Sequence, residues 1–103
     1  MALPLETWDR ARRLWEAGRY WEVHEVLEPF WLRAEGAEKE LLQGVIQLAA
    51  ALHKARSDRQ AAERIVERAL GHLEKAGAPE LAGPAIEALS NPDLPLPFPL
   101  GLE

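Results

Sequence analysis

Apolar residues recur along the chain at the three- and four-residue spacing of amphipathic helices, and glycines and prolines interrupt the pattern. In the first of these segments Trp8, Ala11 and Trp15 share one face, and Gly18 follows as a left-handed stop. The spacing predicts four main helices and a short fifth, over residues 5–17, 19–34, 38–56, 58–76 and 80–89. The fold class is therefore predicted to be all-α, a compact bundle forming one helical domain.

The predicted third helix, residues 38–56, is apolar over most of its circumference. One stripe of large aliphatic residues runs along it, and alanines cover much of the rest. Such a helix is expected at the centre of a bundle. The fourth helix is expected to begin at a capping box, because Ser57 precedes Gln60 at the required spacing.

Prolines dominate the last part of the chain and end the helical pattern. Each proline lacks an amide donor and disfavours a helical conformation in the residue before it. Residues 90–103 are therefore predicted to form an extended, proline-rich tail. Apolar residues alternate with prolines there, namely Leu94, Leu96, Phe98 and Leu100, so we expect this strip to pack on the bundle or on a partner.

Composition narrows the possible functions. The chain has 103 residues, of which 48% are hydrophobic, enough for one modest core. With 17 acidic and 12 basic residues its net charge is −5, which disfavours nucleic acid and anionic membranes as partners. Cysteine is absent, so a disulfide or thiolate metal site is excluded, and the cytoplasm is the simplest expected location. No apolar run has the length of a membrane span.

The segment YWEVHEVLEPFW, residues 20–31, carries the most suggestive chemistry. On a helix that advances about 100° per residue, His24 and Glu28 lie about 40° apart. The aromatic residues on the same side are Tyr20, Trp21 and Trp31. We therefore predict that the pair is buried within an aromatic face, where polar groups need hydrogen-bond partners.

Partners for this pair must come from a neighbouring helix. Gln43 and Gln47 share a polar stripe of the predicted helix 38–56, and Gln47 is the natural partner if that stripe faces His24. His53 lies on a separate arc of the same helix and is a candidate metal ligand.

Two interpretations of the pair compete. In the first, His24 and Glu28 bind a divalent metal such as zinc or manganese, with Glu25 or His53 as third ligand and Glu25 otherwise serving as a catalytic base. The HExxE spacing is similar to the H-E-x-x-H of zinc proteases, with glutamate in place of the second histidine. In the second, His24, Glu28 and Gln47 form a structural polar network that fixes helix register.

Two blocks of the sequence together resemble the bacterial family known as domain of unknown function 309. The blocks are YWEVHEVLEPFW, residues 20–31, and LLQGVIQLAAALH, residues 41–53, within a resemblance that covers about residues 8 to 75. The resemblance implies a compact helical bundle. Members of that family have been labelled predicted metal-dependent hydrolases, a label that matches the HExxE pattern.

A looser similarity links residues 8–28 to a tetratricopeptide-type helical hairpin, although no second copy follows at a period of about 34 residues. Two function hypotheses result. The chain is either a metal-dependent hydrolase centred on His24, Glu25 and Glu28, or a non-catalytic helical interaction module. In the second case its aromatic or proline-rich surfaces could form a homodimer.

Overall fold

The computed structural model describes residues 3–91 and 96–101 and shows an all-α protein, as predicted. Over these residues the chain forms five α-helices and one 3₁₀ turn. They are α1 (Leu5–Glu16), α2 (Tyr20–Arg33), α3 (Gly36–Lys54), α4 (Arg59–Lys75), the 3₁₀ turn η1 (Pro79–Ala82) and α5 (Gly83–Ser90). Within the described ranges, no helix is both long enough and apolar enough to cross a membrane.

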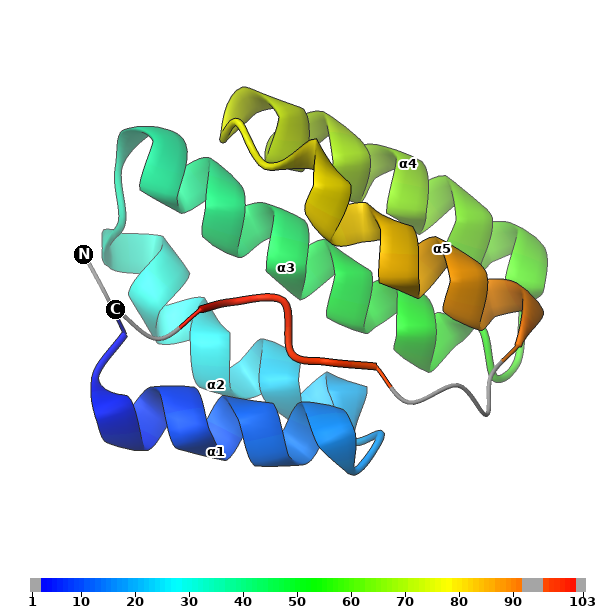
Figure 1. Ribbon diagram of the computed structural model, residues 1–103, viewed down its shortest axis with the longest axis horizontal. Helices are drawn as coiled ribbons and strands as arrows, with labels where there is room; N and C mark the ends of the chain where they lie inside the picture. Colours follow the sequence, from blue (N-terminus) through cyan, green and yellow to red (C-terminus); the bar gives the residue numbers. More distant parts are fainter. Residues whose placement is uncertain (1–2, 92–95, 102–103) are drawn as a thin grey trace.

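Helix α3 lies between two groups of helices (Figure 1). Helix α2 packs on one side of it and carries α1, while α4 and α5 pack on the other side. Of the five helices, α3 contributes the largest set of buried residues, which are Leu42, Gly44, Val45, Ile46, Leu48, Ala49, Ala51 and Leu52. The apolar circumference of this helix thus lets it contact neighbours on both sides.

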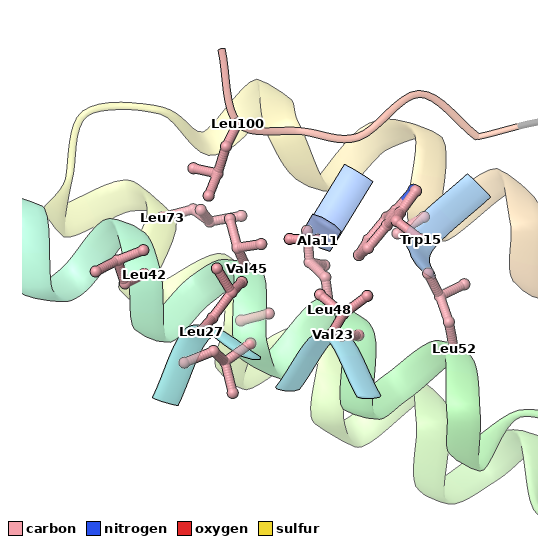
Figure 2. Close-up of a cluster of buried hydrophobic side chains, with 14 of the residues drawn as sticks. Ala11, Trp15, Val23, Leu27, Leu42, Val45, Leu48, Leu52, Leu73 and Leu100 are labelled. Atoms are coloured by element: carbon pink, nitrogen blue, oxygen red, sulfur yellow. The ribbon is translucent and has the colours of Figure 1, made fainter. Parts of the chain in front are cut away.

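The core is formed where these helices meet (Figure 2). Figure 2 shows its main side chains, Ala11 and Trp15 from α1, Val23 and Leu27 from α2, Leu42, Val45, Leu48 and Leu52 from α3, Leu73 from α4, and Leu100. Gly44 allows α3 and α4 to approach closely, because a Cβ at this position would lie 2.6 Å from Leu73 Cγ. The small residue is therefore a packing requirement rather than a flexible point.

Helix ends follow the expected chemistry at one position and differ at another. Gly18 has a φ of +75°, so the left-handed stop after α1 is present. Helix α4, however, is capped by Asp58, whose side chain accepts a 3.0 Å hydrogen bond from the Ala61 amide. The predicted capping box at Ser57 is wrong. The Ser57 hydroxyl instead donates a hydrogen bond to the carbonyl of Lys54, the last residue of α3.

Residues 96–101 cross the bundle beside α1 (Figure 1). Leu100 is buried, and its carbonyl accepts a 2.9 Å hydrogen bond from Trp8 Nε1. The Phe98 ring meets the rings of Trp8 and Trp15 edge-on, with centroid distances of 6.2 and 5.8 Å. This part of the chain thus covers the aromatic side of α1. The remainder of the predicted tail, residues 92–95 and 102–103, lies outside the described residues.

Candidate functional site

The buried face of α2 is not the one that the aromatic residues indicated. Val23 and Leu27 are fully buried, whereas the side chains of His24 and Glu28 are 24% and 47% exposed. Trp21 is 51% exposed. The prediction of a buried His/Glu pair is therefore wrong: the pair lies at the surface, beside the core.

The reason is that α2 carries two apolar arcs. Tyr20, Val23, Val26, Leu27 and Phe30 fall within about 120° of the helix circumference and exclude His24 and Glu28. This arc packs against the rest of the core. The arc containing Trp21 is left at the surface because a helix lying between α1 and α3 cannot bury its whole circumference.

His24 is held by its neighbours on the same helix. Its ring stacks on Trp21, with centroids 4.9 Å apart and an interplanar angle of 10°. Its Nδ1 atom lies 3.7 Å from Glu28 Oε2, a distance too long for a hydrogen bond. This Nδ1 is shielded from solvent and has no hydrogen-bond partner in the described part of the chain. The contact with Glu28 is an ion pair only when the imidazole is protonated.

The pair opens onto a cleft of about 250 Å³ between α2 and α3. The cleft residues are His24, Glu28, Trp31, Gln43, Ile46, Gln47 and Ala50. The structure therefore brings the predicted polar stripe of α3 to the predicted pair on α2. However, Gln47 forms no hydrogen bond with His24, so the predicted polar network is not closed by direct contacts among the described residues. At the edge of the cleft Lys39 Nζ lies 4.9 Å from the centroid of the Trp31 ring.

The other two candidate residues lie elsewhere. Glu25 lines a separate cleft of about 370 Å³ with residues of α1, among them Glu6 and Arg10. His53 is exposed on α3 and contacts the Trp21 ring at a centroid distance of 5.7 Å, outside the cleft. Across residues 3–91 and 96–101, no three histidine, aspartate or glutamate side chains gather closely enough to hold a metal ion.

A polar contact between α3 and α4 was not predicted from the sequence. His72 on α4 and Glu40 on α3 form a hydrogen bond of 2.6 Å between Nδ1 and Oε2. This hydrogen bond, together with the charges of His72 and Lys75, lowers the pKa of Glu40 below its usual value. The signal available in the sequence was the place of His72 at the edge of the apolar face of its helix, where a side chain can reach a neighbouring helix.

Comparison with known proteins places the chain in a family. The sequence model of a protein family, the domain of unknown function DUF309, matches residues 8–66. The chain belongs to the DUF309 family. The matched part of this DUF309 protein contains the pair on α2 and every residue of the cleft that it faces. No match was found among curated proteins.

A solved structure resembles this DUF309 protein over most of its length. It is the crystal structure of a conserved hypothetical protein, TTHA0068, from Thermus thermophilus. The two sequences are 43% identical, and the match covers 87% of this chain and 99% of the other, with a TM-score of 0.73. The helical fold is therefore shared with that protein.

Proposed function

We propose that this DUF309 chain is a non-catalytic helical interaction module that binds a peptide segment of a protein partner in the cleft between α2 and α3. The observation that carries the proposal is the composition of the cleft. It presents amide, imidazole, carboxylate and apolar groups on two rigid helices that pack against each other. Surfaces of this mixed character suit the recognition of peptides.

The two glutamines give the cleft its capacity to bind a main chain. Gln43 and Gln47 are one helical turn apart on α3, so their side chains are neighbours. Each primary amide offers a carbonyl acceptor and two N–H donors, which match the N–H and C=O groups of a peptide. Neither side chain forms a hydrogen bond within the described part of the chain. These groups are therefore available to a ligand.

The remaining lining residues suggest which side chains the peptide would carry. Trp31 and Ile46 provide apolar surface for an aliphatic or aromatic side chain. Glu28 is half exposed and favours a lysine or arginine beside it. Trp21 stands next to the cleft on the His24 ring and adds the kind of exposed aromatic surface that contributes strongly to protein interfaces. The expected ligand is thus a peptide with an apolar and a basic residue.

A selection from a displayed library of random peptides, followed by calorimetry on the purified peptides, tests the proposal. Peptides that bind the unmodified chain should bind the double variant Gln43→Ala, Gln47→Ala about tenfold more weakly or worse, because hydrogen bonds to the peptide are lost. Gln60→Ala is the matched control, since Gln60 is an exposed glutamine of α4 outside the cleft. Selected peptides that bind all three proteins equally would overturn the proposal.

A metal-dependent hydrolase is the second candidate, and one observation favours it. The Nδ1 of His24 is shielded from solvent, unpartnered among the described residues and 3.7 Å from a carboxylate oxygen, as a pair of ligands would be. Against it, two protein ligands fall short of the roughly three that a catalytic zinc normally has. Glu25, the proposed base, lines a different cleft, and His53 lies outside the cleft of the pair.

Metal analysis separates the two candidates. The chain without an affinity tag is dialysed against zinc or manganese, and bound metal is measured by mass spectrometry. The interaction module predicts metal well below one ion per chain and no change in His24→Gln. Stoichiometric metal that His24→Gln abolishes, with an unchanged melting temperature, would establish a metal site and contradict the module.

A further inference from the structure

A third cavity shares no lining residue with either of the two clefts described above. The turn between α1 and α2, the end of α3 and the end of α5 meet around it, and all three lie at the same end of the molecule (Figure 1). Its volume is about 470 Å³, within the range of small-molecule sites. Leu52, Ala88 and Leu89 contribute to its apolar wall.

One cation faces this apolar wall. Arg56 lines the cavity, donates a hydrogen bond from Nη2 to the Gly18 carbonyl, and lies over the Tyr20 ring with Cζ 5.4 Å from the centroid. These two contacts restrict the long side chain to one region. A guanidinium has five N–H donors, so several remain for a ligand.

Among the described residues, no neighbouring acid neutralises the charge of Arg56. Within residues 3–91 and 96–101 no carboxylate forms an ion pair with it. Arg12, Arg19 and Arg59 do have such partners, in Asp9, Glu22 and Glu63. Several other arginines, Arg64 among them, have none within the described residues, so the distinction of Arg56 is that it lines this cavity. Arg56 is thus positioned by neutral groups while its charge remains free for an anion.

Tyr20 supplies a second polar group. The Tyr20 ring is fixed by an edge-on contact with Trp15, at a centroid distance of 5.3 Å and an angle of 80°. A tyrosine phenol is protonated at neutral pH and can donate a hydrogen bond, and burial raises the pKa of the Tyr20 hydroxyl further. No hydrogen bond of this hydroxyl is found in the described part of the chain.

We propose that this cavity binds a small aliphatic carboxylate. The carboxylate would lie on the Arg56 guanidinium, and the hydrocarbon chain would lie against Leu52, Ala88 and Leu89. A free inorganic anion fits less well, because it would leave the apolar wall without a contact. A neutral hydrocarbon fits less well too, because it would leave the guanidinium without its anion.

Hexanoate, hexanol and inorganic phosphate are suitable probes. Their binding is measured from the ¹H–¹⁵N chemical shifts of the full chain. Hexanoate should give saturable shifts at the amides of Tyr20, Arg56 and Leu89, and hexanol should bind about tenfold more weakly or worse because it lacks the charge. Arg56→Gln should weaken hexanoate by a similar factor and leave hexanol unchanged. Arg64→Gln is the matched control, since Arg64 is an exposed arginine of α4 outside the cavity.

A second variant separates loss of the site from loss of the fold. Tyr20→Phe keeps the ring that supports Arg56 and removes only the hydroxyl, so it should weaken hexanoate without altering circular dichroism. The proposal is overturned if hexanoate gives no saturable shifts at tens of millimolar, if phosphate binds as well as hexanoate, or if folded Arg56→Gln binds hexanoate as the unmodified chain does.

Discussion

Trp8 Nε1 donates a 2.9 Å hydrogen bond to the Leu100 carbonyl across 92 positions of sequence. The bond fixes the strip of residues 96–101 on α1, and the Phe98 ring then packs edge-on against Trp8 and Trp15. Leu100 continues into the core cluster (Figure 2). Residues 96–101 are therefore a structural part of the bundle, although they belong to no helix or strand.

Removing the Phe98 ring should destabilise the protein. Phe98→Ala deletes a partly buried ring that touches two tryptophans, so we expect the free energy of unfolding to fall by about 2–4 kcal/mol, towards the lower end of core phenylalanine truncations. Urea denaturation followed by tryptophan fluorescence measures the change. Pro97→Ala, at an exposed neighbouring position, should cost less than about 1 kcal/mol. A loss in Phe98→Ala as small as that expected for Pro97→Ala would show that the Phe98 ring does not contribute to the stability of the core.

Two glycine substitutions should have opposite signs. Gly44→Ala places a methyl group 2.6 Å from Leu73 Cγ, and Leu73 is fully buried and cannot move aside freely. We expect it to lower the free energy of unfolding by about 1–3 kcal/mol through overpacking. Gly71 lies on α4, and a Cβ at this position would meet no neighbouring atom within 4 Å. Gly71→Ala should therefore stabilise the helix by up to about 1 kcal/mol. Thermal melts of both variants test this, and a stabilised Gly44→Ala would contradict the close packing of α3 on α4.

The Glu40–His72 hydrogen bond should make stability depend on acidic pH. The pKa of Glu40 is lowered in the folded protein, first by the hydrogen bond to His72 and then by the charges of His72 and Lys75. A carboxyl group whose pKa is lower in the folded than in the unfolded state stabilises the fold at pH values above its unfolded-state pKa. This contribution is lost as the pH falls through the folded-state pKa. Glu40→Gln should therefore be less stable than the unmodified chain at neutral pH, and the difference should disappear in acid.

Urea denaturation over a range of pH values checks this sign. Glu74→Gln is the control, because Glu74 is an exposed carboxylate on α4 that does not contact His72 through a hydrogen bond. A Glu40→Gln deficit that stays constant from neutral to acidic pH would rule out the linkage, as would an equal deficit in the control.

The sequence predicted the elements of this fold better than their contacts. The four longer helices and the stop at Gly18 follow from local spacing and from the φ that glycine tolerates, and both are encoded within a few residues. The predicted helix 80–89 differs, because the 3₁₀ turn Pro79–Ala82 precedes α5, which begins at Gly83. The cap at Asp58 was missed because Ser57 and Asp58 are adjacent and both are good caps; the backbone path decides between them.

The residues of the candidate site could be predicted from the sequence only in part, because their exposure and contacts depend on how the helices pack. The sequence left open whether the polar stripe of α3 faces α2; in the structure Gln43 and Gln47 line the same cleft as the pair on α2. The exposure of His24 and Glu28 was not predictable from the tryptophans, because a helix with two apolar arcs can bury either one. The Glu40–His72 contact depends on how α4 packs on α3, which the local sequence pattern does not predict.

The orientation of α2 provides the last prediction. Leu27 is fully buried on the inward arc, so Leu27→Ala should lower the free energy of unfolding by about 2–5 kcal/mol. Glu28, its neighbour in sequence, is half exposed and accepts no hydrogen bond among the described residues, so Glu28→Gln should change stability by less than about 0.5 kcal/mol. Chemical denaturation of the two variants compares the arcs directly. A large fall in the free energy of unfolding of Glu28→Gln would favour the structural polar network. Removing the charge of a carboxylate lowers stability strongly when that carboxylate has partners in the fold. A small loss, with peptide binding reduced, would instead assign Glu28 to the surface that the proposed partner contacts.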